Sequence, residues 1–386
     1  MMHADHRARL TRALEGGLVV LTAYDAMQLS SDMAAPFVQE ANFWWATGID
    51  APGWKVIIEG SRKHATLVRP KRSDVDIIFN GADEDDAYRE TSGISEIIDE
   101  KDFEPRLRQL RRTHPMVYAL SSRHRDGEFV HNPATRHLEE TLKRIFERVV
   151  DARPDLARLR AVKSPEEIAR IEQAIALTNE AFSAVREKLP TLKTEQVIDA
   201  EFTYRFRRAA ATHAYEPIVA AGEHACTLHY DKNTGPVHVR DIVLIDIGAR
   251  VDGYCADITR SYCVRPTKRQ RAVHKAVASA QKEIIALIEP NMPTSEYLKS
   301  ADDIMKKALI SLGLLEDSTD EKAYRRYCPH SIGHGLGVDV HDPLGAPRLL
   351  EPGMVMTVEP GIYIAEEGIG VRIEDTRIAL PILAIA

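Results

Sequence analysis

The stretch Ile242–Val264, IVLIDIGARVDGYCADITRSYCV, decides how the rest of the sequence is interpreted. It predicts two strands, Ile242–Ala249 and Cys255–Val264, which are rich in apolar and β-branched residues. Asp252-Gly253 lies between them, and Asp-Gly is a dipeptide favoured in two-residue hairpin turns. The stretch therefore predicts an antiparallel β-hairpin.

Each predicted strand carries one aspartate in an apolar setting, Asp246 in the first and Asp257 in the second. Directly opposed residues of an antiparallel pair point to the same face, so the turn decides whether the carboxylates meet. A two-residue loop at Asp252-Gly253 pairs Asp246 with Thr259 and leaves Asp257 diagonal to Asp246 on the same face. A loop at Val251-Asp252 would set the carboxylates directly opposite, and only an odd-length loop would separate them.

Two carboxylates on one face of a buried hairpin repel each other and lose hydration, so a positive charge is expected between them. One interpretation assigns one aspartate to a turn or cap and pairs the other with Arg260. The second interpretation places a bound cation between the carboxylates. The hairpin alone leaves both open.

The 386-residue chain is long enough for two domains, and its composition is that of a globular protein. It is 44% hydrophobic and 28% charged, with a mean hydropathy of -0.27. A net charge of -7 offers no support for a nucleic-acid partner. No apolar run approaches the roughly 18 residues of a membrane-spanning helix, and the first residues lack a signal-peptide pattern. Four cysteines without paired spacing indicate reduced thiols and a cytoplasmic location.

Residues 1–155 predict a small α/β domain, because short apolar strands alternate with helical segments. Helices are predicted at His6–Glu15, Ser92–Asp99 and Pro133–Val149, and strands at Leu18–Thr22, Lys55–Glu59, Ala65–Arg69, Asp76–Phe79 and Met116–Leu120. The alternation favours a mostly parallel or mixed sheet covered by helices. This domain shows no catalytic constellation.

Residues 156–386 predict a larger second domain, which begins with a strong helix signal. Ser164 is the expected N-cap, Pro165 the first helical residue, and Glu167 completes a capping box. Further helices are predicted from about Thr194, at Lys268–Ile288 and at Tyr297–Leu312, with a strand at Tyr215–Ala221.

Three histidines lie in the segment CPHSIGHGLGVDVHD, which runs from residue 328 to 342: His330, His334 and His341. A single histidine among apolar residues is most often a satisfied core residue. Three of them in a loop with glycines, which allow close backbone approach, favour a functional site instead.

Two glutamates follow at strand positions. Glu359 ends the apolar segment Met354–Ile364, directly before Pro-Gly. In Gly370–Arg377 the alternation of a strand places Glu374 on the same face as Arg372.

Five residues therefore stand out, four carboxylates and one imidazole: Asp246, Asp257, His334, Glu359 and Glu374. Buried carboxylates in that number need divalent cations, since one ion neutralises two of the four charges and two ions neutralise all four. A set rich in oxygen, with one nitrogen and no thiolate, suits manganese, cobalt or zinc at a catalytic site and argues against a structural zinc. Two ions can activate a water for hydrolysis.

The chain resembles the pita-bread metallopeptidases, in particular the prolidase and aminopeptidase P branch. The matching pieces are LIDIGA…GYCADITR, HSIGHGLGVDVHD, VEPGIYI and GIGVRIEDT, together with FVQEANFWWATGID near the start. The resemblance covers nearly the whole chain, and the ligand order Asp, Asp, His, Glu, Glu is highly specific. It implies an α+β fold, with a C-terminal pita-bread catalytic domain and a smaller N-terminal α/β domain.

The resemblance also implies roles for the five ligands. Asp246 and Asp257 would bind and bridge two divalent metal ions per subunit, with Glu374 as a second bridge. His334 and Glu359 would each complete the coordination of one ion, and Glu359 would also carry the proton of the bridging water.

Other residues match the substrate side of the family's site. His229 and His341 would orient the peptide and stabilise the oxyanion, and His330 matches a nearby pocket histidine. Tyr363 and Arg372 match a hydrogen-bonded pair that supports the first metal-binding aspartate. This last role agrees with the need for a cation beside the ligand strand.

The expected reaction is hydrolysis of the Xaa-Pro bond in dipeptides, as in a prolidase, by a hydroxide that bridges the metals. The alternative is an Xaa-Pro aminopeptidase, which removes the N-terminal residue from longer peptides. Arg348 is the candidate for a dipeptide's terminal carboxylate, with an ordinary surface arginine as the other reading. Manganese is the expected metal, with cobalt or zinc as alternatives, and a homodimer is expected in which the N-terminal domain helps close the partner's site.

Three other classes fit the sequence less well. A methionine aminopeptidase would leave the N-terminal domain without a counterpart. Creatinase-like members work without metals and lack the ligand set. A non-catalytic pita-bread binding module predicts missing ligands, and none is missing.

Overall fold

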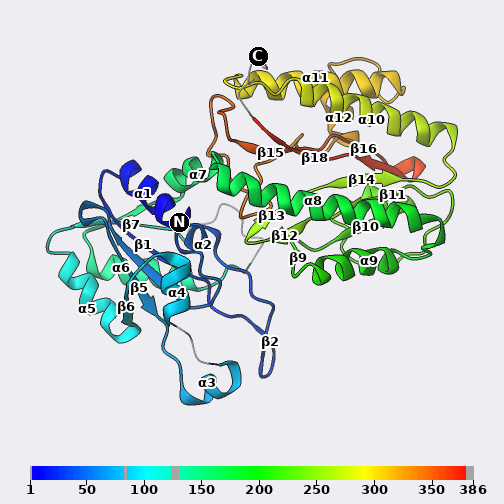
Figure 1. The fold of residues 1–386 in the computed structure, drawn as a ribbon. Helices are drawn as coiled ribbons and strands as arrows, with labels where there is room; N and C mark the ends of the chain where they lie inside the picture. The colour runs from blue at the N-terminus through cyan, green and yellow to red at the C-terminus, as the bar shows by residue number, and fades with distance from the viewer. Residues whose placement is uncertain (1, 82–84, 123–129, 380–386) are drawn as a thin grey trace, which may run out of the picture. The chain divides into compact units, whose positions relative to one another are not determined.

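The computed structural model describes residues 2–81, 85–122 and 130–379. The chain divides into two compact units, Met1–Leu159 and Arg160–Ala386, which run from blue to green and from green to red in Figure 1. The division falls inside helix α7 (Arg153–Ala161), close to the boundary predicted between residues 155 and 156.

The first unit is built on a six-stranded mixed sheet with the order β6-β5-β4-β1-β7-β8. The strands β1, β4 and β5 pair antiparallel, and the remaining pairs are parallel. The sheet strands are β1 Leu18–Thr22, β4 Lys55–Glu59, β5 His64–Arg69, β6 Glu96–Asp99, β7 Met116–Ala119 and β8 Arg148–Asp151, and a separate hairpin joins β2 Gln28–Ser30 to β3 Met33–Ala34. The mixed sheet confirms the α/β prediction for this unit.

Helices cover this sheet, and those on one face bury the core that contains Phe103, Leu107 and Leu142. These helices are α5 Glu100–Leu110 and α6 Ala134–Ile145; the others of the unit are α1 Met2–Ala13, α2 Ala41–Thr47, α3 Asp74–Asn80 and α4 Asp85–Ser92. Apolar side chains recur on α5 and α6 at helical spacing, so each helix presents one apolar face to the strands.

Three predictions for this unit are wrong. The predicted strand Asp76–Phe79 is part of helix α3, whose N-cap Ser73 accepts a hydrogen bond from the Asp76 N–H. The second half of the predicted helix Ser92–Asp99 is strand β6, which pairs parallel with β5. The predicted helix Pro133–Val149 ends at Ile145, and the sequence after it forms strand β8 against β7. Short apolar runs carry little periodicity, so caps and sheet partners decided these segments.

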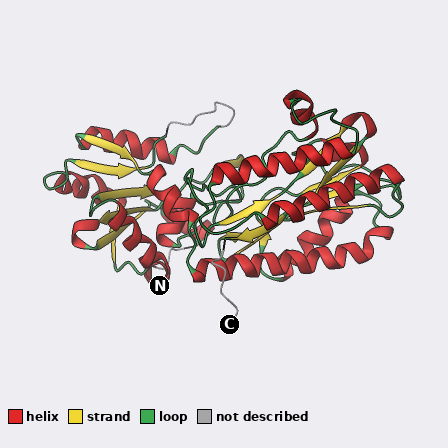
Figure 2. Ribbon diagram, turned by 90° about the horizontal axis from the view of Figure 1, so that it is seen from above, coloured by secondary structure: helices red, strands yellow, loops and turns green. Residues whose placement is uncertain are grey.

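The second unit has two halves, each with helices outside and strands inside. In the first half, helices α8 and α9 pack on the strands β9 to β14; in the second, α10 and α11 lie by β15 to β18. Figure 2 shows the long helices of this unit on the outside, with the strands between them. The helices are α8 Pro165–Lys188, α9 Glu195–Arg208, α10 Lys268–Ala286, α11 Thr294–Ser311 and α12 Glu321–Tyr327.

The strands of the second unit are short. They are β9 Thr212–His213, β10 Ile218–Ala221, β11 Val243–Asp246, β12 Ala249–Val251, β13 Tyr254–Cys255, β14 Thr259–Tyr262, β15 Val355–Val358, β16 Gly361–Ile364, β17 Ile369–Arg372 and β18 Asp375–Ile378. Helix α8 begins with the predicted capping box of Ser164 and Glu167, with Pro165 as its first residue. No helix among the described residues is long and apolar enough to cross a membrane.

The decisive hairpin has the predicted register. Asp246 pairs with Thr259, and Val251 pairs with Tyr254 on the other side of the turn. Asp252 and Gly253 both have positive φ, +46° and +81°, which fits the type I′ turn that matches the twist of two antiparallel strands. The turn therefore brings both aspartates to the same face of the hairpin.

Candidate active site

One cavity of about 370 Å³ in the second unit collects the residues singled out from the sequence. The five candidate metal ligands all line it: Asp246, Asp257, His334, Glu359 and Glu374. They come from both halves of the unit, because the two aspartates belong to the hairpin and the other three follow α12. The cavity therefore forms only where the two halves meet.

A tyrosine joins the two aspartates. The Tyr215 hydroxyl lies 2.5 Å from Asp246 Oδ1 and 2.6 Å from Asp257 Oδ1, so one hydroxyl hydrogen serves two carboxylates. The sequence analysis did not single out this residue. A tyrosine just before an apolar strand is ordinary packing, and only the fold shows what its hydroxyl contacts.

The cation beside Asp246 is Arg372, which donates a hydrogen bond to Asp246 Oδ2. Its guanidinium also donates to the Tyr363 hydroxyl at 2.8 Å, so the predicted Tyr363–Arg372 pair is present. Arg260, the partner considered for a hairpin aspartate, instead binds Asp375 Oδ1 at 2.6 Å. The interpretation in which one aspartate serves a turn or cap and the other pairs with Arg260 is therefore wrong.

Glu374 connects the second half to the hairpin. Its N–H donates to the Thr259 carbonyl at 3.0 Å, and its Oε2 accepts from the Thr259 hydroxyl at 2.7 Å. The other carboxylate oxygen, Oε1, is buried and has no hydrogen-bond partner among the residues that the structure describes. A buried carboxylate oxygen left in this way fits a metal ligand.

His334 presents one ring nitrogen, Nε2, to the acidic groups. Its Nδ1 lies 2.9 Å from the Gly335 carbonyl, which only accepts, so Nδ1 carries the hydrogen. Nε2 faces Asp257 Oδ2 at 3.4 Å and Glu359 Oε1 at 3.6 Å. The imidazole therefore lies beside two carboxylates, and an imidazole nitrogen with carboxylate oxygens is a common donor set for divalent metals.

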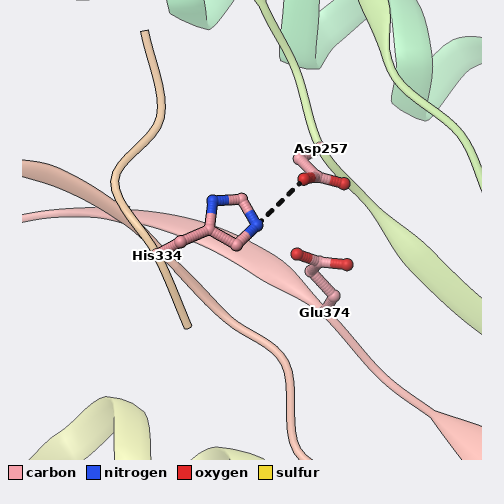
Figure 3. A group of neighbouring side chains, drawn as sticks. All are labelled: Asp257, His334 and Glu374. Atoms are coloured by element: carbon pink, nitrogen blue, oxygen red, sulfur yellow. Dashed lines mark ion pairs between the residues drawn. The ribbon is translucent and has the colours of Figure 1, made fainter. Parts of the chain in front are cut away.

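Figure 3 shows that Asp257, His334 and Glu374 converge from three separate segments of the unit. One ligand atom of each residue lies within 4.8 Å of the others, which is close enough for a single ion to bind all three. The donor set of two carboxylates and an imidazole suits a divalent cation.

The raised pKa values of these carboxylates show that bringing them together disfavours their ionised forms. Burial and then the charge of Glu374 raise the pKa of Glu359 to about 8. Burial and the charge of Asp246 raise the pKa of Asp257 well above its usual range, and burial and Asp257 do the same for Glu374. Without a bound cation the cluster therefore holds protons instead. The residues present fit a divalent metal centre.

Three histidines also line the cavity, as predicted. The rings of His341 and His334 pack edge to face with centroids 4.2 Å apart. Burial and the neighbouring His334 lower the pKa of His341, which favours its neutral form. His229 is exposed at the cavity wall.

His330 ends a chain of hydrogen bonds that begins at Arg372. The guanidinium donates to the Tyr363 oxygen, and the Tyr363 hydroxyl lies 2.8 Å from His330 Nε2. His330 Nδ1 lies 2.7 Å from the Ser331 carbonyl, so both ring nitrogens have protein partners. Burial, and then Arg372, lower its pKa to about 4. His330 therefore offers the face of a neutral ring to the cavity.

Arg348 lies outside this cavity. Its side chain is exposed and is absent from the lining. Its carbonyl accepts a hydrogen bond from the Thr294 N–H at 3.0 Å, and Leu349 pairs with Pro293. These contacts hold its segment beside the start of α11, so Arg348 is not among the candidate residues that the structure brings to the cavity.

Comparison with known proteins agrees with this geometry. The sequence profile of metallopeptidase family M24 matches residues 169–379. The chain belongs to this family. The profile of the aminopeptidase P N-terminal domain matches residues 3–118, which places this M24 member in the aminopeptidase P branch. The predicted family and pita-bread fold are confirmed, and the protein is a metallopeptidase that depends on divalent metal.

Similar proteins include the Xaa-Pro aminopeptidase of Escherichia coli K12, which is 31% identical over 93% of this chain and 88% of its own length. Among solved structures, an aminopeptidase P from Bacillus anthracis, described as putative in its own name, has a TM-score of 0.88 at 28% identity and covers 98% and 92% of the two chains. Zinc-substituted aminopeptidase P of E. coli in complex with product has a TM-score of 0.85 at 29% identity and covers 98% and 93%. These names favour the alternative of an aminopeptidase over the prolidase first expected.

Proposed function

We propose that this M24 enzyme is an Xaa-Pro aminopeptidase, which removes the first residue of peptides whose second residue is proline. The observation that carries the proposal is that five candidate ligands and three histidines line one cavity. The names of the most similar relatives support an aminopeptidase. The exposed Arg348 supports it too, because the residue offered for a dipeptide's carboxylate does not reach the cavity.

We propose two divalent ions per subunit, with manganese as the native metal and cobalt or zinc as substitutes. Arg372 offsets one of the four carboxylate charges, which leaves more negative charge than a single divalent ion neutralises. Asp246, Asp257 and Glu374 would hold both ions, and His334 and Glu359 one each. Bound there, the ions would polarise the scissile carbonyl and lower the pKa of the attacking water.

The protein's own groups would move protons and orient the peptide. Glu359, with a pKa raised to about 8 before metal binds, is placed to take the proton of the attacking water and give it to the leaving proline nitrogen. His229 and the neutral His341 would each donate a hydrogen bond to the carbonyl oxygen as negative charge develops there. Selectivity for proline would come from shape, since its tertiary amide offers no N–H to bind.

We also propose that the enzyme is a homodimer. Several large apolar side chains of the first unit are exposed, among them Leu29 and Met33 of the β2–β3 hairpin and Phe79 of α3. Exposed apolar side chains of this kind favour association. Light scattering during size-exclusion chromatography would give the mass directly.

The function is tested by stripping the protein of metal, reloading it with manganese, cobalt or zinc, and offering Ala-Pro and Ala-Pro-Ala. We expect the tripeptide to be cleaved after alanine, and Asp257→Asn to abolish this activity. Cleavage of the dipeptide alone would make the enzyme a prolidase. If metal binds but neither peptide is cleaved, the proline specificity is wrong while the metal centre stands.

A further inference from the structure

The loop between β10 and β11 forms one wall of the cavity. It leaves β10 at Ala221, makes a short 3-10 turn (η3, Gly222–Cys226) and contributes three neighbouring lining residues, Leu228, His229 and Asp231. These residues lie in no strand or helix, so no ladder of backbone hydrogen bonds fixes them. Something else must hold His229 in place.

A single buried carboxylate provides this hold. Glu195 is the first residue of α9 and is fully buried, with 0% of its surface exposed. Its Oε1 accepts from the Ala221 N–H at 2.8 Å and lies 2.9 Å from His224 Nδ1. Its Oε2 accepts from the Tyr230 hydroxyl at 2.9 Å and from the Gly235 N–H at 2.5 Å. Four donors thus converge on two oxygens.

The four donors come from the start, the middle and the end of the loop. His224 also stacks on Tyr230, with ring centroids 4.4 Å apart and planes 22° apart. A side chain at Gly235 would place its Cβ 2.8 Å from Glu195 Oε2, so only glycine lets this backbone N–H approach the carboxylate. The loop is therefore built around Glu195.

A second tie strengthens the end of the loop. Asn233 is buried and accepts from the Val219 N–H at 2.8 Å, while its amide donates to the Pro217 carbonyl at 2.9 Å. These contacts fasten the returning chain to β10 without touching the metal ligands. Tyr230, next to His229, packs in an apolar cluster, and Glu195 is the partner that its hydroxyl binds there.

We propose that Glu195 is a positioning residue: through Tyr230 and the loop backbone it holds His229 at the cavity wall, in the orientation that the peptide needs. This inference rests on the proposed function for its kinetic consequence, but the hydrogen bonds to the loop exist independently of it. Among the described residues, Glu195 does not line the cavity and forms no hydrogen bond with a candidate metal ligand. A displacement of His229 by about 1 Å is enough to lower catalysis by up to about 100-fold.

The test uses Glu195→Gln, which keeps the shape of the side chain. An amide accepts at one oxygen only and presents donors at the other position, so one backbone N–H of the loop, that of Ala221 or of Gly235, meets a donor instead of an acceptor. We expect kcat/KM on Ala-Pro-Ala to fall by about 10- to 100-fold. Manganese affinity should change by less than about twofold, because no ligand lies on this loop.

The matched control is Glu201→Gln on the same helix, whose carboxylate pairs with Lys188 at 2.8 Å. Its activity should stay within about twofold of wild type. A double-mutant cycle with His229→Ala then shows whether Glu195 acts through His229. If it does, Glu195→Gln costs less than about twofold once His229 is removed. Equal losses with and without His229, or unchanged activity, would overturn the proposal.

Hydrogen exchange of the loop amides, 222–236, gives a readout that needs no activity. Faster exchange in Glu195→Gln than in Glu201→Gln is expected, and equal exchange contradicts the proposal. If wild-type protein cleaves no Xaa-Pro peptide, the proposed function fails while this comparison still decides what Glu195 holds. Should Glu195→Gln not fold, Tyr230→Phe removes one of the four contacts and serves in its place, with faster exchange around residue 230 as the expected result.

Discussion

At two places in the second unit, the pKa values of buried acids are shifted in opposite directions. In the cavity, burial and mutual repulsion raise the pKa values of Asp257 and Glu374 well above their usual range. Asp342, which follows the cavity histidine His341, is just as buried, yet its pKa is lowered.

The difference lies in the partners. Burial opposes ionisation of Asp342 as well, but the charges of Arg160 and Lys163 outweigh it. Asp342 Oδ1 accepts from Arg160, and Oδ2 accepts from Lys163 Nζ at 2.9 Å, with all three side chains almost inaccessible to solvent. The cavity acids share one arginine, Arg372. Asp342 has two cationic partners for one carboxylate, whereas the four cavity carboxylates have one arginine among them.

The largest effect should come from removing one cavity acid. Glu374→Gln deletes a ligand while keeping the shape, and we expect kcat/KM to fall on the order of 1000-fold. The unfolding temperature of the metal-free protein should not fall, because the amide removes a charge from a crowded group. Peptidase assays and calorimetry on the same preparation check both parts. A clearly lower unfolding temperature of the metal-free variant would contradict the claim that the cavity acids repel one another.

The opposite result is expected for Asp342→Asn. It removes the anion that Lys163 and Arg160 share and leaves Arg160 paired with Asp339, so the free energy of unfolding should fall by about 3–5 kcal/mol. Urea denaturation measures this, and Glu166→Gln in the exposed pair with Arg170 is the control, with less than about 0.5 kcal/mol expected. A loss below about 1 kcal/mol would show that the two cations find other partners.

The pH dependence of the metal-free protein should carry the signature of the cavity acids. Glu359 has a pKa of about 8 when folded, against an ordinary value of 4.5, so between these values the folded state binds more protons than the unfolded state. Stability should therefore fall as the pH rises from about 5 to 8, and manganese should reverse the fall. Thermal unfolding of wild type and Glu359→Gln tests this, since the variant should show a shallower slope. Equal slopes would rule out Glu359 as the source.

The smallest effect is expected from removing the hydroxyl of Tyr215, which is the uncharged partner of the two aspartates. Tyr215→Phe removes the hydroxyl shared by Asp246 and Asp257 but leaves every charge in place. We expect manganese to bind about tenfold more weakly, as is usual when a group that orients a ligand is lost. Titration calorimetry gives the affinity. Unchanged affinity would mean that Arg372 alone orients the aspartates.

The sequence predicts the structure correctly where the rule involves only neighbouring residues, as in a turn or a helix cap. It also predicts the site where an acidic residue stands in an apolar strand. Asp-Gly selects its own turn, and the period of two then places Asp246 opposite Thr259. The capping box of Ser164 needs only four consecutive residues. Acids inside apolar strands were visible as anomalies, and all five predicted ligands do line the cavity.

The rest depended on contacts between distant segments. Lys163 and Asp342 are 179 positions apart, and nothing local to either residue shows that they pair. From the sequence alone, Glu195 is an ordinary glutamate at the start of a helix. Only the fold shows that the loop binds its carboxylate. Strand β6 was mistaken for a helix because its partner β5 lies elsewhere in the chain. The place of Arg348 outside the cavity lining could not be predicted for the same reason, since the sequence around a loop arginine does not show which element its segment contacts.

The hydrogen bond between Thr259 and Glu374 has a consequence for biosynthesis. The two residues are 115 positions apart, so the hairpin leaves the ribosome about 6 to 23 seconds before Glu374 at ordinary rates of synthesis. During that interval the aspartates have no second half to meet. The nascent chain therefore carries no working peptidase, and hydrolysis begins only once the later half of the unit has been made.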